Sequence, residues 1–316
     1  MKFAIGLCKP GEKIYDICVK ADQHVRDSLA KVYQKQKHFK GLAFPTSISV
    51  NEICGNYSPV AEESSDPAEY RVLSEGDVAK IDLGVHINGF SAVVAHTVVV
   101  SLKDEVVTGK KADVILAAYN ALQAAIRTMY IKPENTNSAV TAATKKICDA
   151  YKVTPVEGVL SHRMRRDIID GPEVIINHAT YDQKVEERPF DFGDVFGLDV
   201  IVTSGEGKPK ETELRTTVYK RAIETSYKLK TESGRKLLAV VEQNFHTFPF
   251  SFNSFDNESG LKMKQKIVIY FSSSLNLNLF EFIGSLHDIY RITSKLLLKL
   301  VSLNVLKTNS YILILS

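Results

Sequence analysis

The alternation of apolar and polar positions is clearest in residues 80–100, KIDLGVHINGFSAVVAHTVVV. Two apolar-rich segments flank an Asn-Gly dipeptide, which favours the two-residue turn of a β-hairpin. A turn at this place pairs Gly84 with Val93. Because side chains alternate along a strand, Asp82 and Gly84 share one face of the hairpin, and Val93 is the diagonal neighbour of Asp82 on that face.

Two pairs of similar segments indicate an internal duplication. Helical apolar spacing follows a Lys-Pro dipeptide twice, in KPGEKIYDICVKADQHV from Lys9 and in KPENTNSAVTAATKKICDAY from Lys132. A β segment interrupted by an aspartate also occurs twice, in EGDVAKIDLGV from Glu75 and in FGDVFGLDVIV from Phe192. The two pairs have nearly the same separation along the chain, so the repeat predicts two similar halves.

The duplication predicts an α+β domain over residues 1–263, with halves at about residues 1–105 and 106–263. A pseudo-twofold axis between such halves brings the aspartates of the two β segments, Asp82 and Asp199, together. In the second half an amphipathic helix precedes the Lys-Pro segment. Too few residues precede the first Lys-Pro segment for a helix of that length, so we expect the first half to lack it.

Composition and charge add only broad limits. A chain of 316 residues that is 44% hydrophobic can bury a core, and 40 basic against 37 acidic residues do not by themselves indicate a nucleic-acid-binding protein. The four cysteines lie far apart without a C-x-x-C pair, which is typical of a reducing compartment and not of a disulfide or zinc framework. Neither terminus has the uninterrupted apolar run of a signal peptide or a membrane helix, so we expect no secretion and no membrane anchor.

Four segments together resemble a known family: FPTSISVNEICGNYSP, KIDLGVHINGFSAVVAHTVVV, TPVEGVLSHRMRRDIIDG and FGDVFGLDVIVTSGEGKPKETELRTTVYKR. They are similar to the methionine aminopeptidase superfamily, and more closely to its non-peptidase branch, the eukaryotic proliferation-associated, ErbB-receptor-binding proteins. The resemblance runs from about Lys9 to about Met263. It implies the α+β pita-bread fold of creatinase and methionine aminopeptidase, with its internal duplication, here truncated at both ends.

The resemblance also places the peptidase metal ligands on this chain. The first aspartate ligand falls on Asp82, the histidine ligand on His162, and a glutamate ligand on Asp199. The second aspartate, which bridges the two metal ions in the peptidases, falls on Val93. Two cations about 3.5–4 Å apart repel each other unless shared oxygen atoms lie between them, and valine has no side-chain oxygen.

Further parts of the peptidase site have no counterpart here. We find no match for the last bridging glutamate, and the two substrate-handling histidines fall on Asn56 and Asp170, which cannot serve as a neutral imidazole. The sequence therefore predicts a protein that is not an enzyme and needs no cofactor, with a vestigial pocket at Asp82, His162 and Asp199. One alternative is that these three ligands hold a single metal ion and support residual aminopeptidase activity.

For this branch, the resemblance implies binding to ribosomes or structured RNA and to protein partners. It further implies a role in growth and translation regulation, in the cytoplasm and the nucleus. Basic clusters give independent support, because they could neutralise phosphates; the alternative is that they are solvated surface. The RNA-binding candidates are Lys35, Lys37, Lys40, Arg163, Arg165, Arg166, Lys208 and Lys210.

The tail, residues 264–316, has a different character. It contains neither Ala nor Pro and is rich in Leu, Ile, Ser, Asn and Lys, whose codons are rich in A and T. We interpret it as the product of a shifted reading frame or an unspliced segment; the other interpretation is a divergent C-terminus. In either case we expect the closing strands of the second half to be absent or replaced, and a non-functional truncated product is a further alternative.

Overall fold

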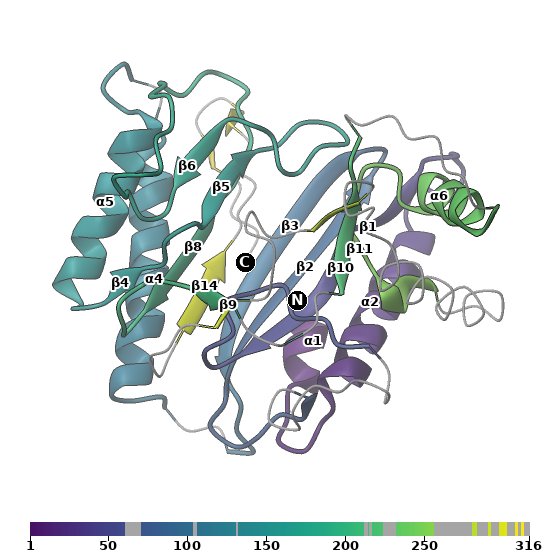
Figure 1. Ribbon diagram of the computed structural model, residues 1–316, viewed down its shortest axis with the longest axis horizontal. Coiled ribbons are helices and arrows are strands. Elements are labelled where there is room, and N and C mark those ends of the chain that lie inside the picture. The colour runs from purple at the N-terminus through teal and green to yellow at the C-terminus, as the bar shows by residue number, and fades with distance from the viewer. Residues whose placement is uncertain are drawn as a thin grey trace.

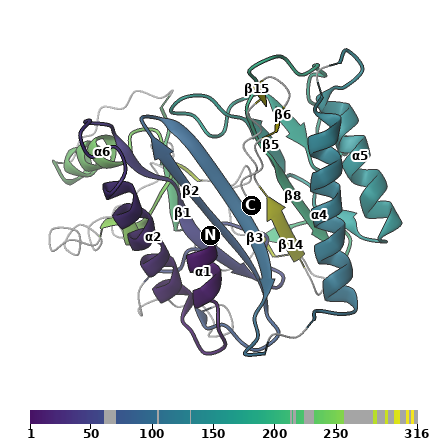
Figure 2. The same cartoon turned by 180° about the vertical axis from the view of Figure 1, so that it is seen from behind.

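The computed structural model describes residues 1–60, 71–103, 106–130, 132–211, 214, 217–223 and 232–255, together with five short strands in the last 37 residues. It has two halves, each with a β-sheet covered by helices (Figure 1). Seen from behind, α1 and α2 cover the sheet of the first half, and α4 and α5 cover the strands of the second half (Figure 2). In the part that the structure describes, this arrangement agrees with the predicted duplication.

The first half contains α1 (Lys2–Leu7), α2 (Ile14–Ala30), β1 (Lys40–Val50), β2 (Val78–Ile87) and β3 (Phe90–Val99). Its three strands form an antiparallel sheet in the order β1-β2-β3. The predicted hairpin register is confirmed, because Gly84 lies opposite Val93 and Asp82 lies opposite Ala95. The chain turns at Asn88, which has a φ of 53°, and Gly89, which has a φ of 85°, as a type I′ turn requires.

The second half contains α4 (Lys110–Thr128), α5 (Asn137–Ala150), β4 (Thr154–Pro155), β5 (Leu160–Arg163), β6 (Val174–Ile176), β7 (Phe196–Gly197) and β8 (Asp199–Thr203). Thr136 starts α5, since its hydroxyl oxygen accepts a hydrogen bond from the backbone N–H of Ala139 at 3.2 Å. The pair α4 and α5 repeats the order of α1 and α2. The first half therefore has a short counterpart of α4, namely α1, which has 6 residues compared with 19 in α4. This differs from the expectation that the first half lacks the helix.

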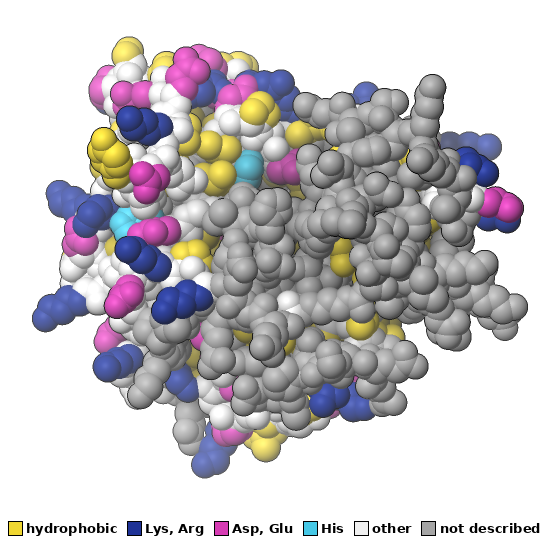
Figure 3. Space-filling model, in the orientation of Figure 1, with side chains coloured by type: hydrophobic (Ala, Val, Ile, Leu, Met, Phe, Trp, Pro, Cys, Tyr) yellow, Lys and Arg dark blue, Asp and Glu magenta, His cyan; other side chains and the backbone are white. Residues whose placement is uncertain are grey.

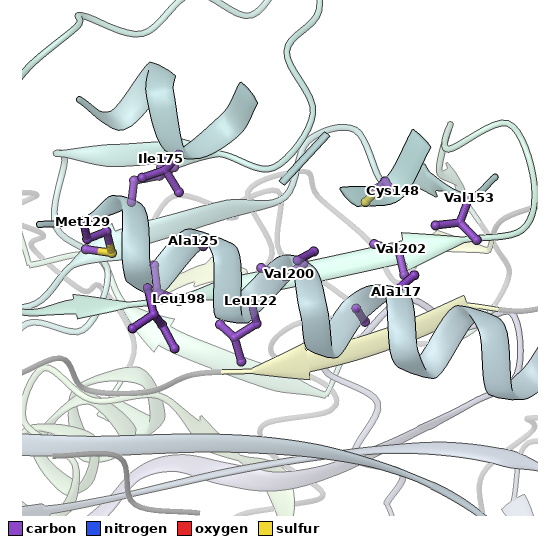
Figure 4. Packing of buried hydrophobic residues seen from close by; sticks show 14 of the residues in the cluster. Ala117, Leu122, Ala125, Met129, Cys148, Val153, Ile175, Leu198, Val200 and Val202 are labelled. Carbon is purple, nitrogen blue, oxygen red and sulfur yellow. The ribbon is translucent and has the colours of Figure 1, made fainter. Parts of the chain in front are cut away.

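Alanine-rich packing holds α4 against β8 in the core of the second half (Figure 4). Ala117 and Ala125 of α4 are buried in the same cluster as Val200 and Val202 of β8. Small side chains let the helix lie close to the strand, while Leu122 fills the space beside them. Burial of a leucine or valine side chain stabilises the folded state by about 1.5–3 kcal/mol, so this cluster fixes the position of β8.

The remaining elements lie after β8. They are β9 (Lys210–Glu211), β10 (Val218–Arg221), α6 (Glu232–Asn244), β11 (Phe250–Ser251), the 3₁₀ helix η1 (Phe252–Phe255), β12 (Phe280–Phe282), β13 (Tyr290–Arg291), β14 (Leu297–Val301), β15 (Lys307–Thr308) and β16 (Tyr311–Ile312). Strand β14, which lies in the tail, pairs antiparallel with β8. Most of the tail lies outside the described residues, and its reading frame and the proposed domain boundary stay predictions.

Candidate functional site

Asp82 lies in the middle of β2 and is buried. Ser47 of β1 is its partner across the sheet, and the Ser47 hydroxyl lies 3.5 Å from Asp82 Oδ2. The carboxylate thus faces a position where the neighbouring strand supplies a hydroxyl group. Asp82 is therefore a buried polar residue whose hydroxyl partner also belongs to the first half of the fold.

Val93 lies where the two halves meet. An added Cβ on Gly84 of β2 would be 2.7 Å from Val93 Cγ1, and an added Cβ on Gly197 of β7 would be 3.7 Å from Val93 Cγ2. The isopropyl group therefore fills a narrow gap between one glycine of each half. Hydrocarbon occupies the place that the resemblance assigns to a bridging carboxylate.

His162 and Asp199 come from neighbouring strands of the second half. His162 of β5 pairs with Gly197 of β7, so it lies on the strand next to the Val93 contact. Its Nδ1 is 2.9 Å from the carbonyl oxygen of Gly171, which can only accept, so we assign the ring proton to Nδ1. The backbone N–H of Asp199 donates to Ser161 Oγ at 2.8 Å, which ties β8 to β5.

Strand β14 of the tail lies beside β8, which carries Asp199. Residue Val301 of β14 lies opposite Asp199 in the antiparallel register. The sequence of β14 is LLKLV, without Asp or Glu. The predicted absence of the last bridging glutamate stays a prediction.

An ion pair occupies one of the two histidine positions. Lys220 Nζ of β10 lies 2.5 Å from Asp170 Oδ2; the Lys220 side chain is buried and the Asp170 side chain is partly exposed. A buried ammonium paired with a carboxylate is a structural contact and offers no neutral base at this position. Sequence reasoning missed Lys220, because no local pattern links residues 50 positions apart. The other substrate-handling histidine of the peptidases falls on Asn56, whose backbone φ is 61°.

The donor set does not fit a pair of catalytic metal ions. In the described ranges, no three His, Cys, Asp or Glu side chains converge on a point where they could hold one ion. Val93 supplies hydrocarbon at the position that the resemblance assigns to a shared oxygen atom. We therefore derive no catalytic step from these residues.

All three arginines in the sequence HRMRR make ion pairs within the chain, and the one of Arg166, with Asp167 at 3.8 Å, is the longest. Arg163 contacts Glu173 at 2.9 Å and Asp194 at 2.7 Å, and Arg165 contacts Glu173 at 2.5 Å. Burial acts to raise the pKa of Glu173, but the hydrogen bond from Arg163 and the nearby positive charges outweigh it, and the pKa is lowered overall. These contacts compete with any phosphate for Arg163 and Arg165.

The remaining RNA-binding candidates differ in what they contact. Lys40 Nζ donates to the carbonyl oxygens of Leu29 at 3.0 Å and Val32 at 2.7 Å, so it caps the C-terminal end of α2. Arg166 is exposed beside the β2–β3 turn. The other candidates, Lys35, Lys37, Lys208 and Lys210, are exposed.

Charged side chains of both signs are intermixed over α4 and α5, at the left of Figure 3. That face has no single-sign patch, which agrees with the small formal net charge of +3. None of the helices in the described ranges is long and apolar enough to cross a bilayer.

Solved structures show the class of protein that this fold and site define. A thermophilic Arx1 matches with a TM-score of 0.79 and 25% sequence identity, over 94% of this chain and 81% of that chain. The methionine aminopeptidase of Rickettsia prowazekii shares the fold with a TM-score of 0.52 and 17% identity, over 68% of this chain and 78% of that chain. These matches place the chain in the class of proteins that have the pita-bread fold of the metallopeptidases.

Sequence comparison identifies the family, and the predicted family and fold are confirmed. The family model of metallopeptidase family M24 matches residues 1–218. The chain belongs to this family and, within it, to the proliferation-associated, ErbB-3-binding branch.

Three curated relatives carry the assignment to this branch. Schizosaccharomyces pombe curved DNA-binding protein is 43% identical over 84% of this chain and 69% of its own length. Proliferation-associated protein A of Dictyostelium discoideum is 39% identical over 82% of this chain and 66% of its own length. ErbB-3 binding protein 1 of Solanum tuberosum is 40% identical over 79% and 63%, respectively. The chain thus spans about two thirds of the length of these relatives.

Proposed function

We propose that this chain is a non-catalytic member of the family that binds structured RNA or the ribosome, together with protein partners, in the regulation of growth and translation. The observation that carries the non-catalytic part is the position of Val93, whose methyl groups pack between Gly84 and Gly197. A two-metal hydrolase needs a shared oxygen at this point to hold its ions and to lower the pKa of the bound water from 15.7 toward about 7.

The names of the relatives support the binding part. One is named as a curved DNA-binding protein and another as an ErbB-3 binding protein, so nucleic-acid and protein partners are both represented in the branch. The exposed lysines of residues 31–40 supply charge that suits phosphate groups. Such a role is compatible with residence in the cytoplasm and the nucleus, which we include in the proposal.

The proposed lack of catalysis predicts no release of methionine from a short peptide that begins with Met. The purified protein is assayed with added cobalt, manganese or zinc, and its metal content is measured in parallel. We expect product at the level of the buffer blank, because the residues present cannot bridge two ions. A methionine aminopeptidase assayed in the same buffers is the positive control. Stoichiometric metal together with turnover would instead establish a residual aminopeptidase.

The proposed RNA binding predicts a salt-dependent affinity that depends on Lys35 and Lys37. Substitution of both by Gln is expected to lower the slope of log affinity against log salt by roughly two, about one for each lost phosphate contact. The matched control replaces Lys146 and Lys152, which are exposed on the second half near α5, by Gln. Binding to a structured RNA is measured by titration at several salt concentrations. Equal slopes for the two double variants would contradict this placement of the RNA.

A further inference from the structure

The β2–β3 turn joins two chain segments that are far apart in the sequence. On one side, the backbone N–H of Asn88 donates to the carbonyl oxygen of Phe39 at 2.6 Å. On the other side, Arg166 Nε donates to the carbonyl oxygen of Asn88 at 3.0 Å, and the Asp167 N–H donates to that of Gly89 at 2.8 Å. Two of the predicted basic clusters thus lie on either side of one hairpin turn.

An exposed aromatic ring lies directly after this turn. Phe90 is 66% exposed. The guanidinium carbon of Arg166, whose side chain is 56% exposed, is 5.7 Å from the centre of the Phe90 ring. A cation–π contact at this distance orients the ring without burying it. Sequence reasoning missed Phe90, because an apolar residue at this place in a strand is normally expected in the core.

Basic and aromatic side chains also occur in residues 31–40, the segment whose Phe39 is hydrogen-bonded to the other side of the turn. Residues 31–40, KVYQKQKHFK, contain no acidic residue, and Lys35 and Lys37 in this segment are exposed. Tyr33 is also exposed, and its ring contacts the edge of His38 at 5.6 Å between centroids. The acidic group next to Arg166 is Asp167, whose Oδ2 is 3.8 Å from Arg166 Nε. Arg166, Lys35 and Lys37 thus outnumber this one carboxylate, which itself lies against Gly89 of the turn.

We propose that the hairpin tip, formed by residues 88–90 with Arg166, Lys35 and Lys37, binds unpaired nucleotides of RNA. The inference rests on the proposed RNA binding and specifies which part of the RNA is recognised. An unpaired base stacks on the Phe90 ring, and the basic side chains contact the adjacent phosphates. Duplex RNA offers no free base face, so its binding gains nothing from Phe90.

The chemistry around the tip favours RNA over a protein partner. A protein contact surface of this kind commonly has an apolar centre with few lysines. Here the exposed Phe90 ring contacts an arginine, and the other side of the turn is bonded to a lysine-rich segment that has no acidic residue and carries a second exposed ring, Tyr33. Aromatic rings interleaved with basic groups are typical of surfaces that bind single-stranded nucleic acid.

The test compares an RNA stem-loop with an unpaired loop and a fully paired RNA of the same length. Phe90→Ala is expected to weaken stem-loop binding by roughly 5- to 150-fold, the value of one stacked base, and to leave duplex binding unchanged. Phe90→Leu keeps an apolar side chain without a π face and is expected to lose the same contact, whereas Phe90→Trp retains it. Circular dichroism melting confirms that each variant is folded.

Tyr181→Ala is the matched control. Tyr181 is 89% exposed, more than Phe90, and Lys184 Nζ lies 5.6 Å from its ring centre, so the variant removes an exposed ring with a cationic neighbour that is not part of the tip. We expect Tyr181→Ala to bind both RNAs like the wild type. Suppose that the wild type binds both RNAs, and that Phe90→Ala either leaves both affinities unchanged or lowers both equally. This result overturns the inference and leaves the proposed function intact. Failure of the wild type to bind either RNA overturns both.

Discussion

Acidification from pH 7 to pH 4 is expected to destabilise the fold by up to about 3 kcal/mol through His86 alone. His86 lies on β2, is only 2% exposed, and stacks on Phe248 with 4.1 Å between ring centroids. Burial lowers its pKa from 6.5 to about 4; the Asp167 charge acts in the opposite direction and His246 acts in the same direction. The ring therefore stays neutral in the folded protein at pH 7.

The sign follows from the two pKa values. The pKa of His86 in the folded protein lies below its value of about 6.5 in the unfolded chain, so the unfolded chain binds the additional proton first. The stability contributed by the neutral ring is fully present above pH 6.5. It is lost as the pH falls from about 6.5 through about 4.

Urea unfolding between pH 7.5 and pH 4 measures this effect. His86→Phe keeps an aromatic ring in the stack and removes the titrating group, so the difference between wild type and variant is expected to grow as the pH falls. His24→Phe is the control, since His24 is exposed and its ring stacks on Phe3 at 4.0 Å. Parallel pH profiles for the wild type and His86→Phe would show that His86 is not the sensitive group.

Gly84→Ala is expected to destabilise the protein by about 2–3 kcal/mol through overpacking. The added Cβ would be 2.7 Å from Val93 Cγ1 and 2.9 Å from the backbone nitrogen of Phe44 on β1, both closer than van der Waals contact. Backbone atoms cannot move away without disturbing the β1–β2 pairing. Equilibrium unfolding in urea measures the change in the free energy of unfolding.

A double variant tests where Val93 lies. Val93→Ala removes the methyl group that conflicts with the Cβ introduced by Gly84→Ala and leaves the Phe44 contact, so it is expected to recover part of the lost stability, with a coupling energy of about 0.5–3 kcal/mol. Gly6→Ala is the matched control, because Gly6 is in helix α1 with no atom within 4 Å of the added Cβ. A helical Gly→Ala change without crowding stabilises by about 0.5–1 kcal/mol. Additive effects of Gly84→Ala and Val93→Ala would place Val93 away from Gly84 and weaken the non-catalytic proposal.

Local patterns were sufficient for the elements that depend on neighbouring residues. The Asn-Gly turn sets the register of β2 and β3 because its geometry allows only one pairing of the adjacent residues, and Gly84 does lie opposite Val93. Apolar spacing sufficed to predict α4 and α5, because helical periodicity also depends only on residues a few positions apart. The repeated segments indicated the two similar halves, and the family resemblance supplied the fold.

Contacts between distant parts of the chain could not be read in this way. No sequence pattern shows that Lys220 pairs with Asp170, or that Glu173 and Asp194 engage Arg163. The basic RNA-binding candidates therefore looked equivalent in the sequence. In the structure, some of them have partners within the chain and others are exposed.

From its residues alone, the chain discloses its family, its hairpin register and a valine at the position that the resemblance assigns to a bridging carboxylate. Folding adds the spatial neighbours: it packs Val93 between Gly84 and Gly197, and it brings Phe39 and Arg166 to the same turn. The physical reason is that hydrogen bonding in a turn and apolar periodicity act over a few residues. Ion pairs, ring contacts and close packing depend on the whole chain's path, which no short segment encodes.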